Sequence, residues 1–312
     1  MKSDFLVVCL NSTIQKTIIL NELNENEVNR SSEYRTDASG KGINVTRVLS
    51  QLGSKVIHLT QSGYKSDYFL DLVKQDNLNI SAVPNSSPIR TCTTLISKQN
   101  NSVTEIVEES FPVDSDTENL ILSEYIKLLT KTDSVIISGS KAAGFSKSLF
   151  PEMVRLAKGS KKTAILDYRG KDLINSIPFK PDIIKINFPE FVSTFFPENT
   201  IGEHEENPEL KQRVMVKMKT LLKKYGIKTI LTRGTMPVIY INNDGEIKEE
   251  GIVPVETINT IGSGDAATAG IAFKLNQGES LNEAVKFGIE CGSKNAALVR
   301  PGVINYSSGN NL

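Results

Sequence analysis

The chain has 312 residues, of which 39% are hydrophobic and 23% charged, as in ordinary globular proteins. Its 36 lysines and arginines balance 36 aspartates and glutamates, so no basic excess points to nucleic acid and no charged tail points to a protein partner. The longest N-terminal apolar run, Phe5 to Leu10, is too short for a signal-peptide core or a membrane span. We therefore expect neither nucleic acid nor a membrane among the partners.

Cysteine and histidine usage excludes further classes of protein. Cys9, Cys92 and Cys291 are widely separated and fit neither a disulfide framework nor a zinc site. We therefore expect a reduced, cytoplasmic protein. The two histidines, His58 and His204, argue against a histidine-centred mechanism, and His58 lies in a strand pattern that predicts a core or rim position.

The N-terminal part predicts one buried strand followed by short strands outside the main sheet. Phe5–Leu10 reads as the buried strand, whereas 16–20 has strand propensity and 27–35 alternates loosely. A glycine turn at 37–42 then opens a predicted helix over 43–52, which Gly53 ends. Lys41 in this turn could hold an anion, or could be a solvated lysine in a helix-start loop.

A strand over 56–60 and a helix over 67–75 precede a hairpin signal. The hairpin pairs the alternating runs 90–97 and 102–107. Together with the earlier short strands it predicts a small sheet, inserted at about 12–36 and 89–109 as a lid on a single domain spanning 1–312. Arg90 begins the hairpin and is either a solvated edge residue or an anion ligand.

From residue 117 onward, helices alternate with continuous apolar strands. The predicted helices are 117–131, 146–158 and 208–225, and the predicted strands are 134–138, 163–167, 183–186 and 229–232. This order predicts an α/β fold with a doubly wound, mostly parallel sheet covered by helices on both faces. A hairpin of 237–241 and 247–252 and two last helices, 266–274 and 281–298, complete the pattern.

Ligands of such sheets bind at the carboxyl ends of the strands. Polar or glycine residues follow three of the predicted strands, at Ser138–Ser140, at Lys185–Asn187 with Glu190 just beyond, and at Thr232–Gly234. We therefore expect the site along this edge.

The stretch from Asn259 to Ala267 is the strongest local signal. Small residues, Gly262-Ser263-Gly264, precede Asp265 at the start of a predicted helix. Backbone N–H groups at such a helix start bind anions, and a carboxylate beside them could accept a proton, which is the combination that phosphoryl transfer to a hydroxyl requires.

Two other interpretations of this loop remain open. It could be a tight turn whose aspartate caps a helix, or a dinucleotide fingerprint with Ala267 in the third glycine position. The second interpretation fits poorly, because that fingerprint directly follows a strand early in a domain.

The order of these motifs resembles the PfkB family of sugar kinases, with the ribokinase-like fold, over nearly the whole chain. The segments 37–45 and 259–265 resemble the two family signatures, and 187–190 matches the family's N-x-x-E motif. The runs 28–30, 40–48 and 136–140 resemble the branch of 1-phosphofructokinase and tagatose-6-phosphate kinase.

The resemblance implies a role for each matching residue. Asp265 would be the base, and the backbone of Gly262, Ser263 and Gly264 would hold the transferred phosphate. Asn187 and Glu190 would organise Mg²⁺ through water. The residues along ATP would be Lys185, Asn187, Thr232, Gly234 and Asn295. The residues that bind the substrate would be Gln15, Gly40, Lys41, Asn44, Arg90 and Ser138, with Lys41 and Arg90 on a phosphate that the sugar already carries.

Three positions depart from the family pattern. Gln15 replaces an aspartate that accepts from sugar hydroxyls, Arg169 stands where a small hydroxyl residue is common, and Pro237 replaces a glycine of the nucleotide loop. The leading hypothesis is an ATP- and Mg²⁺-dependent kinase of a ketohexose phosphate, first fructose 1-phosphate, then tagatose 6-phosphate or fructose 6-phosphate. The alternatives are a non-catalytic sugar-phosphate binding protein and a dinucleotide-dependent oxidoreductase. Exposed edges of the lid would favour a homodimer.

Overall fold

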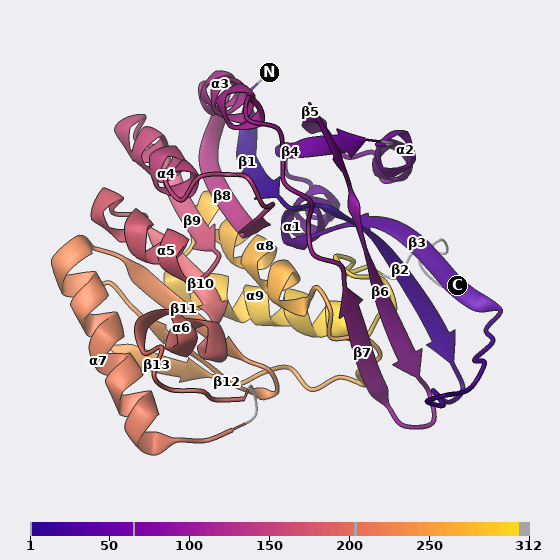
Figure 1. The fold of residues 1–312 in the computed structure, drawn as a ribbon. Helices are drawn as coiled ribbons and strands as arrows, with labels where there is room; N and C mark the ends of the chain where they lie inside the picture. The colour runs from indigo at the N-terminus through magenta and orange to yellow at the C-terminus, as the bar shows by residue number, and fades with distance from the viewer. Residues whose placement is uncertain (1, 65, 203–204, 306–312) are drawn as a thin grey trace.

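The computed structural model describes residues 2–64, 66–202 and 205–305 (Figure 1). Within these residues, nine strands form one sheet and four strands form a second, smaller sheet beside it. The strands of the large sheet are, in spatial order, β13 (Ile247–Glu250), β12 (Met236–Ile241), β11 (Lys228–Arg233), β10 (Ile183–Asn187), β9 (Thr163–Asp167), β8 (Thr132–Lys141), β1 (Ser3–Leu10), β4 (Val56–Tyr64) and β5 (Ile80–Pro88). All neighbours pair in parallel except β11–β12 and β12–β13.

Helices cover both faces of the large sheet (Figure 1). Side chains of α3 (Thr117–Leu129), α4 (Leu149–Gly159), α5 (Lys171–Ser176), α6 (Phe188–Phe195) and α7 (Pro208–Tyr225) form the core on one face. Those of α1 (Lys41–Gln51), α8 (Ser263–Asn276) and α9 (Leu281–Ala296) form the core on the other. No helix among the described residues is long and apolar enough to cross a membrane.

Strand β1 shows why the predicted strands are apolar throughout. Leu6 and Val8 belong to the first core, whereas Phe5 and Val7 belong to the second. Because successive side chains of a strand point to opposite faces, a strand that lies between two cores needs apolar residues at every position.

The small sheet has the strand order β3 (Glu33–Ser39), β2 (Thr13–Leu20), β6 (Arg90–Ser97), β7 (Ser102–Val107). Its β2 and β6 are parallel, with Thr13 opposite Arg90, while the two outer pairs are antiparallel. We call the face that carries Gln15 the inner face; Asp37 and Arg90 lie on it too, by register.

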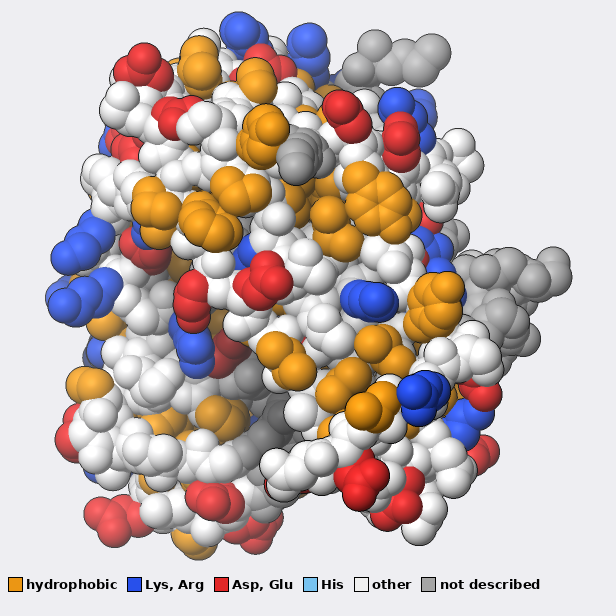
Figure 2. Space-filling model, turned by 45° about the vertical axis from the view of Figure 1, so that its right-hand side comes forward, with side chains coloured by type: hydrophobic (Ala, Val, Ile, Leu, Met, Phe, Trp, Pro, Cys, Tyr) orange, Lys and Arg blue, Asp and Glu red, His pale blue; other side chains and the backbone are white. Residues whose placement is uncertain are grey.

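The opposite, outer face of the small sheet is only partly covered. At one end, Ile14 and Ala38 pack with Phe69 of α2 (Asp67–Gln75). Farther along, Tyr34 is 61% and Ile106 is 56% exposed. Figure 2, in which this side of the molecule comes forward, shows exposed hydrophobic side chains with charges of both signs between them.

The structure confirms the predicted fold class, and several elements match to the residue. Helices α2 and α7, strand β9 and the hairpin β6–β7 have the expected bounds. Helix α1 begins at Lys41 rather than Ile43, and β3 extends to Ser39, past the expected limit of the lid strands.

The sequence analysis missed β5, α5 and α6. Strand β5 contains Pro84 and Pro88, and it pairs only with β4 at the edge of the sheet, where proline is tolerated because one side needs no donor. The two helices have six and eight residues, too few for a clear helical period.

Candidate active site

The glycine loop before α8 has the backbone geometry that only glycine adopts easily. Gly262 is the N-cap of α8 with φ 84°, and a side chain there would meet Asn295 Oδ1 at 2.9 Å. Asn259 anchors the loop, because its side chain donates to the Val299 carbonyl at 2.8 Å and accepts from the Ile261 N–H at 3.0 Å. Within the turn, the Ser263 N–H donates to the Thr260 carbonyl at 3.2 Å, a bond that must yield if this N–H is to bind a phosphate.

Asp265 lies in the first turn of α8 and is 6% exposed. It makes no helix cap, so the capping interpretation is wrong. Its Oδ2 instead accepts a hydrogen bond from the side chain of Asn44, which is 221 positions away in the sequence, at 2.8 Å. Burial raises the pKa of Asp265 to about 6; the charge of Lys41 opposes this rise, and that of Asp167 adds to it. A carboxylate with such a pKa is suited to act as a base near neutral pH.

The second glycine turn presents Lys41 at the start of α1. Gly40 has φ 113°, and a side chain at Gly42 would lie 2.4 Å from Cys9 Cβ, so α1 can approach β1 only with glycine there. Lys41 Nζ lies 3.2 Å from Glu190 Oε1 and 3.5 Å from Asp167 Oδ1. Burial works against the charge on Lys41, but Asp167, Glu190 and Asp265 outweigh it and raise the pKa of this amine. Lys41 is therefore ion-paired at this turn, with 39% of its side chain still exposed to solvent.

Asp167, at the end of β9, is a site residue that the sequence analysis missed. It is 1% exposed, accepts from Thr268 Oγ1 at 2.7 Å and lies 3.9 Å from Lys185 Nζ. Burial opposes its charge, yet Lys185 and Lys41 hold the pKa of this carboxyl below its usual range. The signal was present, because a carboxylate that ends an apolar strand at the ligand edge fits the same rule that singled out three other strand ends.

Asn187 and Glu190 form the N-terminal cap of α6. The Asn187 side chain accepts from the Glu190 N–H at 2.7 Å, and Glu190 Oε2 accepts from the Asn187 N–H at 3.1 Å. This capping box explains the N-x-x-E spacing by helix stability alone. It leaves Glu190 Oε1 facing Lys41. A Mg²⁺ ion keeps several waters and needs one or two carboxylates, so these oxygens fit a water-mediated magnesium site.

Among the described residues, no group of three or more histidine, cysteine or carboxylate side chains could hold a metal ion. The described residues therefore contain no metal site formed by protein ligands alone. A hydrated ion shared with phosphate oxygens is compatible with that result.

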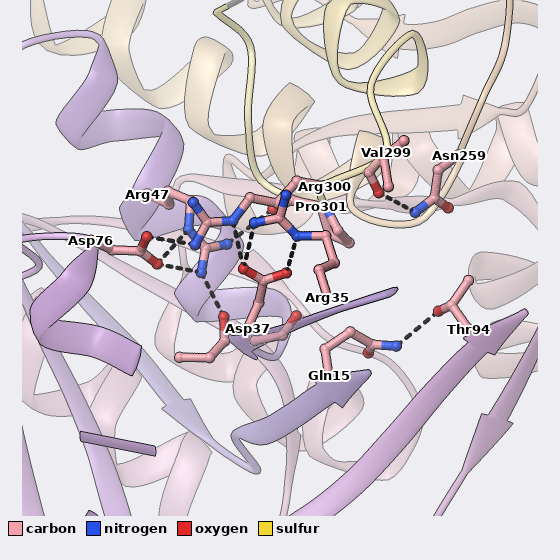
Figure 3. A network of polar contacts seen from close by, with 12 residues as sticks. Gln15, Arg35, Asp37, Arg47, Asp76, Thr94, Asn259, Val299, Arg300 and Pro301 are labelled. Atoms are coloured by element: carbon pink, nitrogen blue, oxygen red, sulfur yellow. Dashed lines mark hydrogen bonds and ion pairs between the residues drawn. The ribbon is translucent and has the colours of Figure 1, made fainter. Parts of the chain in front are cut away.

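Two of the predicted substrate-binding residues, Gln15 and Arg90, lie on the inner face of the small sheet. Gln15 is 2% exposed and its Nε2 donates to Thr94 Oγ1 at 2.8 Å (Figure 3), which directs its carbonyl oxygen elsewhere. Arg90 donates through Nη1 to the Glu108 carbonyl at 3.1 Å, and its buried Nε has no hydrogen-bond partner within the described residues. That N–H can still bind an anion.

The remaining predicted site residues differ in burial and in their partners. Lys185 Nζ donates to the Gly264 carbonyl at 2.7 Å, and Ser138 is buried opposite Asp167. Thr232 is the last residue but one of β11, and Gly234 follows the strand in an exposed turn. Asn295 is fully buried and donates to the Arg300 carbonyl at 3.1 Å, in the segment that follows α9.

The structure shows where two of the residues that depart from the family pattern lie, and where His58 lies. Arg169 and Pro237 are both exposed, the first beyond β9 and the second on β12. His58, as predicted, is a core residue: it is fully buried and its Nδ1 lies 2.9 Å from Thr46 Oγ1. Burial lowers the pKa of His58 to about 3, so it stays neutral. His204 lies outside the described residues.

Comparison with known proteins identifies the family. Residues 4–304 match the pfkB family of carbohydrate kinases. A tagatose-6-phosphate kinase of Staphylococcus epidermidis is 27% identical over 305 residues, which cover 96% of this chain and 94% of that protein.

Solved structures share the fold at low sequence identity. Phosphofructokinase-2 from Escherichia coli, in complex with substrates and products, gives a TM-score of 0.84 at 16% identity and covers 94% of this chain and 93% of its own. A possible 1-phosphofructokinase from Thermotoga maritima gives a TM-score of 0.81 at 21% identity, covering 95% and 92%. The fold is thus ribokinase-like, and the dinucleotide-dependent interpretation is wrong.

We predict that Asp167→Asn lowers the free energy of unfolding at pH 7 by about 2–4 kcal/mol, because the amide leaves buried Lys185 without its counter-charge. The pKa of Asp167 is lower when folded than when unfolded. Its stabilising effect is therefore present above the unfolded pKa and is lost as the pH falls through the folded pKa. Urea unfolding at a series of pH values measures both.

The control is Glu152→Gln, which removes an exposed ion pair with Arg155 and should cost about 0.5 kcal/mol or less. Equal stability of the two variants at pH 7 would contradict a structural ion-pair role for Asp167.

Proposed function

The chain belongs to the pfkB family of carbohydrate kinases, which are phosphotransferases with an alcohol group as acceptor, and on that premise we propose that it transfers the γ-phosphate of ATP to a hydroxyl of a ketohexose phosphate. Fructose 1-phosphate, giving fructose 1,6-bisphosphate, is the first candidate. The observation that carries the proposal is the buried carboxylate of Asp265, with a pKa of about 6, beside Lys41 and the start of α8.

Asp265 takes the proton of the acceptor hydroxyl while the oxygen of that hydroxyl bonds to the γ-phosphorus. The bond from that phosphorus to the β–γ bridging oxygen breaks, and ADP leaves. Because Asn44 already donates to Oδ2, the other oxygen, Oδ1, is the one to receive the proton. A base within hydrogen-bond reach of the hydroxyl contributes about 10²–10⁴-fold to the rate.

Positive charge for the phosphates comes from Lys41, Lys185 and the N-terminal end of α8, where Gly262, Ser263 and Gly264 offer backbone N–H groups. Asn187 and Glu190 would hold Mg²⁺ through its water; when bound, that ion supplies charge that neutralises the phosphate oxygens. Thr232 and Gly234 would line the ATP phosphates, and Asn295 would lie near the adenine end.

A phosphorylated acceptor is favoured by the cations at the sugar end. Gly40, Asn44 and Ser138 would approach the sugar, with Lys41 on one side and Arg90 of the small sheet on the other. The free N–H of Arg90 suits a phosphate oxygen. The curated relative at 27% identity is named for tagatose 6-phosphate, so this sugar and fructose 6-phosphate are the main alternatives to fructose 1-phosphate.

The test is ADP release from Mg-ATP with fructose 1-phosphate, tagatose 6-phosphate, fructose 6-phosphate, fructose and adenosine. We expect turnover with one phosphorylated hexose, and Asp265→Asn should lower that kcat by about 10²–10⁴-fold without unfolding the chain. Turnover of the variant at the wild-type rate would remove Asp265 from the mechanism. Thermal shifts with sugar phosphates but no turnover would favour a non-catalytic binding protein.

We predict that Arg90→Ala raises KM for the sugar phosphate by about tenfold or more, since a charge-assisted hydrogen bond contributes about 1.5–3 kcal/mol, and leaves KM for ATP nearly unchanged. Initial rates with each substrate varied in turn separate the two effects. The control is Lys98→Ala. Lys98 directly follows β6 and is paired with Glu33, so this change also removes a cation from the small sheet. Equal weakening of both substrates would contradict the assigned role of Arg90.

We further propose that the chain is one kinase domain whose small sheet is a lid, and that its outer face joins two copies. Ile18 lies opposite both Tyr34 and Leu95 on this face, so apolar side chains run across it. Phosphofructokinase-2 from Escherichia coli has a tetrameric inhibited form.

Light scattering should give about twice the chain mass of 34.3 kDa. Tyr34→Glu should then give the mass of one chain, because burying an unpaired charge opposes association, whereas Val216→Glu on α7, where Val216 is 55% exposed, should not. A wild-type mass of 34.3 kDa would contradict the dimer.

A further inference from the structure

The amide of Asn44 is held in one orientation by the residues around it. Its Nδ2 donates to Asp265 Oδ2 at 2.8 Å, and its Oδ1 accepts from Arg47 Nη1 at 3.2 Å and from Ser39 Oγ at 3.3 Å. A guanidinium can only donate and an ionised carboxylate can only accept. A flipped amide would therefore place its NH₂ against Arg47 and its oxygen against Asp265.

Arg47 is itself immobile, because all five of its N–H groups are used. Nε and Nη2 donate to Asp76 Oδ2 at 3.0 and 2.8 Å, Nη1 donates to Asn44 and to the Pro301 carbonyl, and Nη2 also donates to the Ala38 carbonyl. Arg47 is 4% exposed. A buried, fully bonded guanidinium is a fixed donor, since moving it would leave several buried acceptors unpaired.

The same guanidinium belongs to a cluster of three arginines and two aspartates (Figure 3). Asp37 of β3 accepts from Arg35 at 2.6 and 2.9 Å and lies 2.8 Å from Arg300 Nε, and Arg300 also donates to Asp76. The cluster joins α1, the end of α2, the segment after α9 and strand β3 of the small sheet. Arg47 is the member that also reaches the amide beside Asp265.

We infer that Arg47 is a positioning residue for the phosphoryl transfer: through Asn44 it fixes the carboxylate of Asp265 with one oxygen bonded and the other turned to the acceptor hydroxyl. This inference rests on the proposed function only for its catalytic consequence. The orientation itself is a property of the unliganded chain. The link to β3 through Asp37 and Ala38 further ties the base to the position of the small sheet.

The relay has a consequence for the titration of Asp265. A hydrogen bond to the charged form lowers the pKa of a carboxyl, so losing the Asn44 bond raises the pKa of Asp265. The charged groups that face Asp265 are Lys41 from α1, Asp167 from β9 and Lys185 from β10, and none of them is altered by a change at Arg47. Because Arg47→Lys keeps the positive charge, a change in this titration would report the lost orientation rather than a lost charge.

The test is carboxyl ¹³C NMR titration of the full chain, with the Asp265 signal assigned by its absence in Asp265→Asn. We expect Arg47→Lys to raise the titration midpoint of Asp265 by about one pH unit, the size of one hydrogen bond to a charged group. Arg300→Lys is the matched control: it changes the same residue type in the same cluster, but Arg300 binds Asp37 and Asp76, so the midpoint should stay.

Kinetics give a second readout. Arg47→Lys should lower kcat about tenfold, because the free energy of one pKa unit, about 1.36 kcal/mol, corresponds to a tenfold change in rate. KM for both substrates should change by less than about threefold. In the Asp265→Asn background the same change should lower kcat no further, because residues that act through one group are not additive. An unchanged midpoint, or the same proportional loss of kcat in both backgrounds, would overturn the relay.

If Arg47→Lys does not fold, the wild-type chain still decides. The side-chain NH₂ signals of Asn44 and the guanidinium signals of Arg47 should both titrate with the midpoint of Asp265, and those of Arg300 should not. Asn44 and Arg47 signals that ignore this midpoint would overturn the inference. Failure of the proposed function would appear differently, as wild-type protein that turns over no acceptor while these titrations remain.

Discussion

Four charged side chains that meet at the carboxyl edge of the large sheet, three of them buried, are the constraint on which the site depends. Asp265 and Asp167 lie beside Lys41 and Lys185. Charges can be buried only when each has a partner, and these four come from α8, β9, α1 and β10. The ion pairs of Asp167 with Lys41 and Lys185, together with the hydrogen bond from Asn44 to Asp265, therefore fix the relative position of these four elements around the site.

The two carboxylates experience opposite effects in this one environment. Asp167 lies between the two lysines and stays ionised, whereas burial dominates at Asp265 and raises its pKa to about 6. Two acids whose surroundings separate their pKa values are suited to different tasks. Asp167 holds the cations in place, and Asp265 is the carboxyl to which we assign proton transfer in the proposed function.

Structural and chemical explanations of a motif do not exclude each other in this chain. Asn187 and Glu190 cap α6 with the backbone, and this use explains their spacing. The cap occupies Oε2 of Glu190 and holds the side chain still, while Oε1 remains directed at Lys41. Asn44 likewise has two partners, because its one amide binds both Arg47 of the arginine cluster and Asp265.

Local signals predicted much of the fold. The bounds of α2, α7, β9 and the β6–β7 hairpin could be read from periodicity and turn residues, because such patterns report the backbone of the segment that contains them. Strand β5 could not, since its two prolines are acceptable only at the sheet edge that the tertiary structure gives it.

For the site, the sequence by itself determined the two glycine turns, the residues that they present and the family resemblance. The positive φ angles of Gly40 and Gly262 are a local requirement of the backbone, so they leave a readable pattern. Only the tertiary structure decided that Asp265 bonds Asn44 rather than capping its helix, that Asp167 lies between two lysines, and that Arg47 donates to Asn44. Those contacts join residues far apart in the chain, and the free energy of pairing a buried charge depends on which partners the packed elements bring to it.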